Sequence, residues 1–231
     1  MTRPNHHFPD DVLRGFAIGT SSEATRLAVS CHLAFCATCQ QGAADHEQVL
    51  GALGRLLGDP WDQVPAGTPG ALPADGAYGR ERLFEALPPR PQRPLPPPSS
   101  ALPDDLPELP PVLTEHLRGL SDPRWRRLIP GIRAIDLGFG DVWRARLVAF
   151  RAGIPIPEHD HSGPEHTVIF QGGLAEPGVD LERGDAATMV PGQHHHQRAA
   201  AGPPCIALIV NERAPRPLTA FGRILKAVTH S

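Results

Sequence analysis

The sequence has no long apolar run and no excess of basic residues. Its 231 residues include 22 Lys and Arg against 25 Asp and Glu, which gives a formal net charge of −3. A chain with this balance has no basic field to hold nucleic acid, so a protein partner or a small ligand is expected. No stretch reaches the length that crosses a bilayer, and the first ten residues lack the apolar core of a signal peptide. The sequence therefore predicts a cytoplasmic protein.

Cysteine is also scarce, with four residues in the whole chain. Because thiols stay reduced in the cytoplasm, closely spaced cysteines are better interpreted as metal ligands than as a disulfide. Cys36 and Cys39 form such a pair. The alternative is a redox pair of thioredoxin type, but no βαβ pattern surrounds these residues. A DNA-binding zinc finger is disfavoured too, because the spacing is not that of a classical finger.

Proline, by contrast, is abundant and unevenly placed. Of the 28 prolines, 11 lie between Pro88 and Pro111, a density at which neither a helix nor a central strand persists. We interpret this segment as a semi-extended spacer with polyproline II character. It divides the chain into a helical domain over residues 1–87, a linker over residues 88–111 and a second domain over residues 112–231.

Residues 10–58 have the periodicity of three helices. Thr20 and Glu23 are placed to form a capping box at the start of the second helix. Residues 77–87 predict a fourth, amphipathic helix. The apolar positions of the third helix are Val49, Leu50, Leu53, Leu56 and Leu57.

Helices this small bury too little apolar surface to be stable alone, so a staple is expected. His32, Cys36 and Cys39 stand at i, i+4 and i+7, and we place all three on one face near the end of the second helix. Two thiolates and one imidazole supply three of the ligands that a tetrahedral structural zinc needs. The remaining ligand is His6 or His7, just ahead of the first helix.

A second constellation of metal-binding residues lies between Gly153 and Gly172. His159 and His161 point to the same face of an extended strand, and Glu165 follows after a turn. With one later histidine, this set suits zinc, iron, manganese or nickel, and geometry decides between them. The alternative is a group of surface histidines, which is disfavoured because a strand of core type follows. The spacing from Gly153 to Gly172 resembles the first sequence motif of the cupin superfamily without a gap.

The later histidine belongs to the stretch from Gly184 to His196, which resembles the second cupin motif. This stretch departs from the motif by one additional residue before Pro191. The ligand is therefore one of three consecutive histidines, His194, His195 and His196, of which we choose His195. A β-sandwich or small barrel is expected around it. Further strand-like segments are residues 132–140, 142–150 and 205–212.

The order of these features resembles a known family. A histidine ahead of the first helix, then His32, Cys36 and Cys39, then a linker and a cupin, is similar to the ChrR-type zinc-binding anti-sigma factors. The family spacing favours His7 over His6. The resemblance implies an α+β multidomain fold, with a small zinc-stapled helical bundle followed by an all-β cupin (jelly-roll) barrel. It implies one Zn²⁺ in the helical domain and a second metal, expected to be Zn²⁺, in the cupin domain.

The function implied by the resemblance is regulation rather than catalysis. The helical domain would sequester an extracytoplasmic-function sigma factor, and the cupin domain would release it under oxidative stress from singlet oxygen or organic peroxide. The rival class is a metal-dependent cupin enzyme, of dioxygenase or isomerase type, with a fused zinc module. A zinc-stapled helical module is not expected in a small enzyme, so we predict that the chain is not an enzyme.

A surface for the sigma factor is predicted on the 77–87 helix. Leu83 and Phe84 lie on its apolar side and can bury against a partner in helix-in-groove fashion. The alternative, equally open from the sequence, is that both residues complete the interior of the helical bundle.

Overall fold

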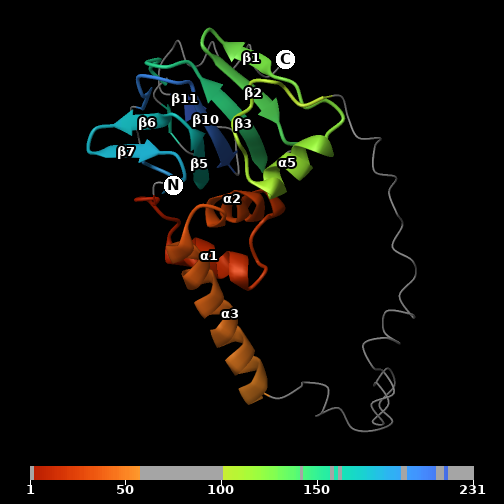
Figure 1. Cartoon of the computed structure of the whole chain (residues 1–231). Coiled ribbons are helices and arrows are strands. Elements are labelled where there is room, and N and C mark those ends of the chain that lie inside the picture. The colour runs from red at the N-terminus through yellow and green to blue at the C-terminus, as the bar shows by residue number, and fades with distance from the viewer. Residues whose placement is uncertain are drawn as a thin grey trace.

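The computed structural model describes residues 3–57, 101–140, 143–156, 159–160, 163–193, 197–211 and 216–217. Antiparallel sheets follow a few N-terminal helices, so the α+β class is confirmed (Figure 1). The helices are α1 (Asp10–Ala17), α2 (Glu23–Leu33), α3 (Ala37–Leu57) and α5 (Pro111–Arg118). Nowhere in the described ranges is a helix long and apolar enough to cross a bilayer. The predicted 77–87 helix, with Leu83 and Phe84, lies outside the described residues.

The described strands form three sheets. The largest has the order β1-β2-β3-β10-β5-β8, with every neighbouring pair antiparallel. A second sheet has the order β7-β6-β9, and β4 pairs with β11. The strands are β1 (Arg126–Ile129), β2 (Ile132–Asp136), β3 (Arg144–Phe150), β4 (His159–Asp160), β5 (Glu165–Gln171), β6 (Gly173–Glu176), β7 (Val179–Glu182), β8 (Ala186–Met189), β9 (Arg198–Ala199), β10 (Cys205–Asn211) and β11 (Arg216–Pro217). The predicted strands at 132–140, 142–150 and 205–212 are thus present as β2, β3 and β10.

The central strands of the largest sheet are buried on both faces. In β10, Ile206 and Leu208 belong to a cluster shared with the helices, whereas Cys205 and Ala207 belong to a second cluster with β6 and β7. Successive side chains of a strand point to opposite faces, so a continuous apolar run needs cover on both sides. Helices α2 and α5 cover one face, and the sheet of β7, β6 and β9 covers the other.

The helical part, residues 3–57, therefore shares a core with the sheets. Val29 of α2 and Leu117 of α5 lie in the same buried cluster as Phe170 of β5. The described portion of the predicted linker packs against this cluster as well. Its contacting residues are Leu102, Leu106 and Leu109.

Helix α2 starts one residue after a capping serine. The Ser22 hydroxyl oxygen accepts a hydrogen bond from the Thr25 backbone N–H at 3.0 Å, which satisfies one of the free donors of the first turn. The predicted capping box of Thr20 and Glu23 is wrong, because Ser22 directly precedes the helix and takes the capping position.

Helix α3 projects from the rest of the molecule. Figure 1 shows its C-terminal half extending away from α1, α2 and the sheets. The apolar residues on this half are exposed and, at helical spacing, lie along one side of the helix. We call this set the α3 stripe: Val49 (59% exposed), Leu50 (48%), Leu53 (48%) and Leu56 (82%).

Candidate metal centre

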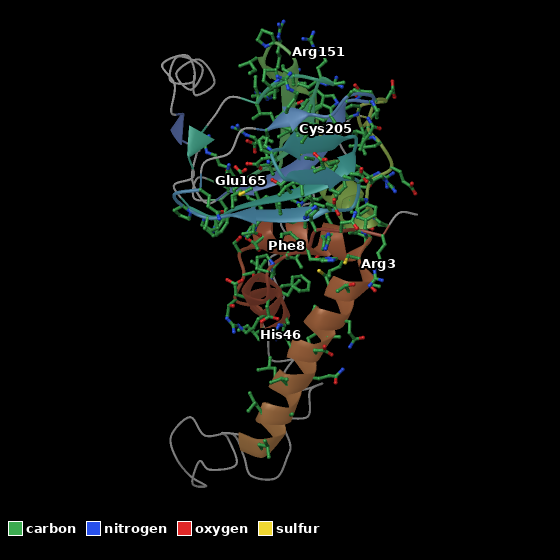
Figure 2. The ribbon with its side chains drawn as sticks, turned by 90° about the vertical axis from the view of Figure 1, so that its left-hand side faces the viewer. Arg3, Phe8, His46, Arg151, Glu165 and Cys205 are labelled. Carbon is green, nitrogen blue, oxygen red and sulfur yellow. The ribbon has the colours of Figure 1, made fainter. Side chains whose placement is uncertain are left out.

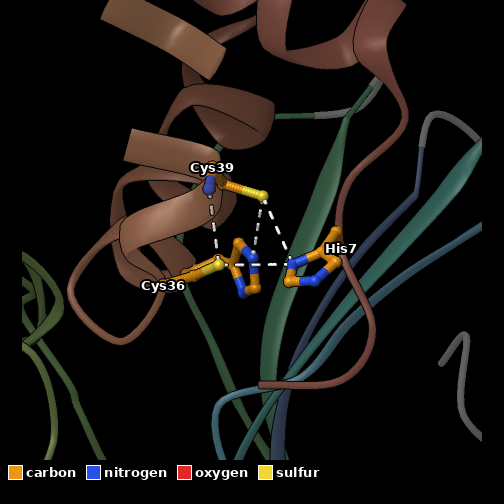
Figure 3. Close-up of side chains that lie close together, drawn as sticks. His7, Cys36 and Cys39 are labelled. Atoms are coloured by element: carbon orange, nitrogen blue, oxygen red, sulfur yellow. Dashed lines mark hydrogen bonds between the residues drawn. The ribbon is translucent and has the colours of Figure 1, made fainter. Parts of the chain in front are cut away.

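Four side chains of the helical part converge on one point. Ligand atoms of His7, His32, Cys36 and Cys39 all lie within 4.8 Å of one another. The Nδ1 atom of His7 is 3.2 Å from the sulfur of Cys36 and 3.6 Å from that of Cys39. On the other side, the Nε2 atom of His32 is 3.3 Å from the sulfur of Cys39. Figure 3 shows the His7 ring facing both thiols.

The ligands come from two helices, the turn between them and the segment ahead of α1. His32 lies in the last turn of α2, Cys36 directly precedes α3, and Cys39 lies in the first turn of α3. The prediction that one helix face presents all three is wrong, because α2 ends at Leu33 and the chain turns before α3 begins. The Cys39 backbone N–H donates to the Cys36 sulfur at 3.4 Å, which fixes the position of that sulfur at the start of α3.

Burial sets the protonation states at the centre. His32 is fully buried, and burial lowers the pKa of its imidazole to about 4, so the ring is neutral, as a metal ligand must be. Burial, and then the neighbouring Cys36 thiol, raises the pKa of Cys39 to about 11. A cation bound here displaces that thiol proton, so metal binding releases protons to solvent.

The donor set fits zinc. In tetrahedral zinc sites the Zn–S distance is about 2.3 Å and the Zn–N distance about 2.0 Å, which places nitrogen and sulfur ligands about 3.5 Å apart. The nitrogen–sulfur distances of 3.2, 3.3 and 3.6 Å match this spacing. Two thiols and two imidazoles are also a ligand set of closed structural sites. The group can therefore hold a metal ion, with His7 bound through Nδ1 and His32 through Nε2. Among the described residues, the group contains His7 and not His6.

The predicted cupin constellation is described only in part. His159 begins β4, which pairs with β11. Glu165 begins β5, where it is buried and accepts a hydrogen bond from the Asn211 side-chain amide at 3.1 Å. The assignment of the whole constellation as a metal site stays a prediction. The members outside the described residues are His161, His194, His195 and His196.

The metal centre also contacts the sheets, which the sequence did not predict. The Nδ1 atom of His32 lies 2.8 Å from the carbonyl oxygen of Gly184, in the turn between β7 and β8. The next residue, Asp185, accepts hydrogen bonds through Oδ1 from the backbone N–H groups of Asn5 (2.7 Å) and His6 (3.0 Å). The signal for this contact in the sequence is the Gly-Asp pair, which also fits the turn of the second cupin motif.

An aromatic side chain seals the junction between the helical part and the sheets. The ring of Phe8 meets the rings of His32 and His166 edge-on, at centroid distances of 5.4 and 5.7 Å. Figure 2 shows Phe8 where the helices meet the sheets. Burial lowers the pKa of His166 to about 4, and its Nδ1 atom lies 3.0 Å from the Thr188 hydroxyl. His166 is therefore a neutral packing residue of this junction.

Comparison with known proteins gives one extended sequence match. No family model matches the chain. The anti-sigma-E factor ChrR of Cereibacter sphaeroides is 31% identical over 217 residues, which cover 94% of this chain and 93% of ChrR. The match therefore includes both the helical part and the sheets.

Solved structures give a matching result. A chain in the crystal structure of Rhodobacter sphaeroides SigE in complex with the anti-sigma ChrR is 28% identical, with a TM-score of 0.64, over 90% of this chain and 98% of that chain. An RmlC-like cupin protein from Ralstonia eutropha matches 47% of this chain and 83% of its own, at 16% identity and a TM-score of 0.36. An anti-sigma factor is a regulator and not an enzyme, as predicted. By the identity and coverage of the ChrR match, this chain belongs to the ChrR family of anti-sigma factors.

Proposed function

We propose that this chain binds an extracytoplasmic-function sigma factor through its helical part and withholds it from RNA polymerase in the cytoplasm. Family membership supports the proposal, and the similar solved chain comes from a complex of SigE with ChrR. Within the molecule, the observation that carries it is the exposed α3 stripe.

The α3 stripe has the form of a helix that docks in a groove. Val49, Leu53 and Leu56 stand at i, i+4 and i+7, the spacing of anchors in helix-in-groove recognition. Burying one such side chain contributes about 1.5–3 kcal/mol, so a partner that covers the stripe gains several kcal/mol. The stripe lies on the half of α3 that projects from the body, where a second protein can reach it (Figure 1). Leu83 and Phe84 remain a proposed second contact for the same partner.

Two zinc ions are part of the proposal. The first is held by His7, His32, Cys36 and Cys39, whose donor atoms and spacing suit it. Its role is structural: it ties the start of the chain to the α2–α3 turn and so fixes the base from which α3 projects. The second zinc is assigned to the cupin domain. In this proposal, that domain covers residues 112–231, follows the 88–111 linker and forms a closed barrel. The proposed ligands of the second zinc are His159, His161, Glu165 and His195.

The proposed signal is oxidative stress. In this account the cupin domain responds to singlet oxygen or an organic peroxide, after which the helical domain, residues 1–87, releases the sigma factor. The extensive contact between the helical part and the sheets supports such control, because a change in the sheets reaches residues beside the metal ligands directly.

The direct test is co-purification followed by transcription. The full chain is produced together with an extracytoplasmic-function sigma factor of the same organism, and the complex is sought by size-exclusion chromatography. Transcription by core polymerase from that sigma factor's promoter is then measured with and without the chain. We expect a stable complex and suppressed transcription, relieved by singlet oxygen or organic peroxide. The proposal would be overturned if none of the organism's extracytoplasmic-function sigma factors formed a complex with the chain and their transcription were unchanged by it.

A further inference from the structure

We infer that the turn between β7 and β8 belongs to the metal centre of the helical part: Gly184 and Asp185 position its two histidine ligands from the sheet side. Affinity for the metal then depends on the docking of the helices against the sheets. The inference rests on metal binding by His7, His32, Cys36 and Cys39, and it is independent of the sigma-factor partner.

The Gly184 carbonyl fixes the tautomer of the His32 ring. A carbonyl oxygen can only accept, so the contact of 2.8 Å requires the proton to be on Nδ1 of His32. The lone pair of Nε2 is then free, and it faces the Cys39 sulfur at 3.3 Å. Because His32 is fully buried, the Gly184 carbonyl and not solvent accepts from this N–H. Outer partners of this kind orient a ligand and raise its basicity.

Asp185 fixes the segment that carries His7. Its carboxylate is only 1% exposed and accepts from Asn5 N at 2.7 Å, His6 N at 3.0 Å and Glu182 N at 2.8 Å. In return, the His6 carbonyl accepts from the Ala186 backbone N–H at 3.1 Å. Charge-assisted bonds to both residues before His7 leave that ligand little freedom to leave the site.

The turn is shaped for this close approach. Gly184 has a φ of +96°, and a Cβ atom there would lie 3.1 Å from Cγ of Pro4 and 3.3 Å from Cβ of Phe35. A residue with a side chain would thus be strained in its backbone and press against the helical part. Glycine lets the carbonyl of this turn reach His32.

The same turn connects the metal centre to strand β5, which begins at Glu165. Asp185 is followed directly by β8, which pairs along its length with β5, placing Met189 opposite Glu165. A shift of β8 against β5 therefore moves Asp185 and, with it, the segment before His7. Coupling of this kind is reciprocal, so metal binding also stabilises docking of the helical part on the sheets.

The test compares Asp185→Ala with Asp180→Ala in the full chain. Asp180 is an exposed carboxylate on β7, so its loss removes the same charge without touching the helical part. Zinc affinity is measured by competition with a chromophoric chelator, and ligand geometry from the absorption bands of the cobalt-loaded protein. We expect Asp185→Ala to weaken zinc binding by about 10- to 100-fold, the usual effect of losing an outer-shell partner, and to shift the cobalt d–d bands. Asp180→Ala should match the wild type in both.

A wild-type zinc affinity and cobalt spectrum in Asp185→Ala would overturn the inference, even if the melting temperature falls. Should that variant fail to fold, Asp185→Asn decides, because it keeps the volume but removes the charge on which the charge-assisted bonds to Asn5 and His6 depend. Weaker zinc binding in Asp185→Asn supports the inference, and unchanged binding defeats it. Absence of zinc binding in the wild type would instead defeat the four-ligand assignment in the proposed function.

Discussion

Each buried thiol of the metal centre holds two segments of chain together. Cys36 faces His7, which lies 29 residues earlier in the sequence, and Cys39 faces both His7 and His32. A structural zinc in such a site contributes about 10–16 kcal/mol to folding at neutral pH, which is comparable to the whole stability of a domain. Four side chains therefore account for a large share of the folding free energy of the helical part when zinc is bound.

We predict that Cys36→Ser removes zinc from the helical part. A serine hydroxyl is a poor ligand, so one equivalent of bound zinc and much of the helicity should be lost, as measured by metal analysis and circular dichroism. Cys31→Ala is the matched control, because Cys31 is equally buried but lies outside the ligand group. Equal zinc content in the Cys36→Ser and Cys31→Ala proteins would refute the assignment.

His166 makes a prediction about acid stability. Its folded pKa of about 4 lies below the ordinary value of 6.5, so it stabilises the fold above pH 6.5, and this contribution is lost as the pH falls towards 4. The advantage of wild type over His166→Gln in free energy of unfolding should shrink by about 3 kcal/mol across this window. The metal centre titrates in both proteins and cancels in the difference. A pH-independent difference in denaturant unfolding would contradict the prediction.

At the level of elements, α3 combines two roles in one helix. Its first turn carries Cys39 into the metal centre, whereas its far half carries the exposed α3 stripe. The projecting half of α3 would be marginal in water as an isolated helix, so anchorage of the first turn at the metal end supports the exposed apolar surface. The helix thereby links metal binding to the surface proposed for the sigma factor.

We predict that Leu53→Glu abolishes sigma-factor binding and leaves the fold intact. The leucine is half exposed and makes no part of the buried cores, so its loss costs little stability. A buried glutamate in a docked interface, by contrast, should weaken the complex at least about 100-fold. Binding is measured by calorimetry and folding by thermal melting. Gln48→Glu, about 140° around the helix, is the control that adds the same charge. Unchanged binding in Leu53→Glu would argue against the stripe.

At the level of the whole molecule, the helical part and the sheets share one buried core. Residues of α2, α5 and the central strands belong to one buried cluster, and Phe8 lies between them. Without the helices, one face of the largest sheet would expose its apolar side chains, which is unfavourable in water.

We predict that removing the metal destabilises the sheets as well as the helices. In a Trp61→Phe protein, treatment with a strong chelator should lower the melting temperature followed by the fluorescence of Trp125 and Trp143, both packed against the shared core. It should do so in step with the loss of helicity, as one transition. Restoring zinc should reverse both changes. If the chelator left the melting temperature of the sheets unchanged while the helices melted, the two parts would be shown to unfold independently.

Much of the architecture was predictable because its signals are local. His32, Cys36 and Cys39 follow from their spacing along the sequence, whereas the choice of His7 over His6 came from the family resemblance. Strands β2, β3, β5 and β10 follow from apolar runs between turns. The boundary of α2 was not predictable from periodicity, since a helix of either length satisfies the same apolar stripe. That is why one helix face was expected where the structure has a turn.

The sequence by itself determined which side chains can bind a cation and which segments can become helix or strand, since both depend on neighbours a few residues away. Only the tertiary structure decided that the helical part docks on the sheets through Gly184 and Asp185. The contact from His32 to Gly184 spans 152 residues. Its energy comes from burying apolar surface and pairing buried polar groups across that distance, and neither leaves a periodic signature in the sequence.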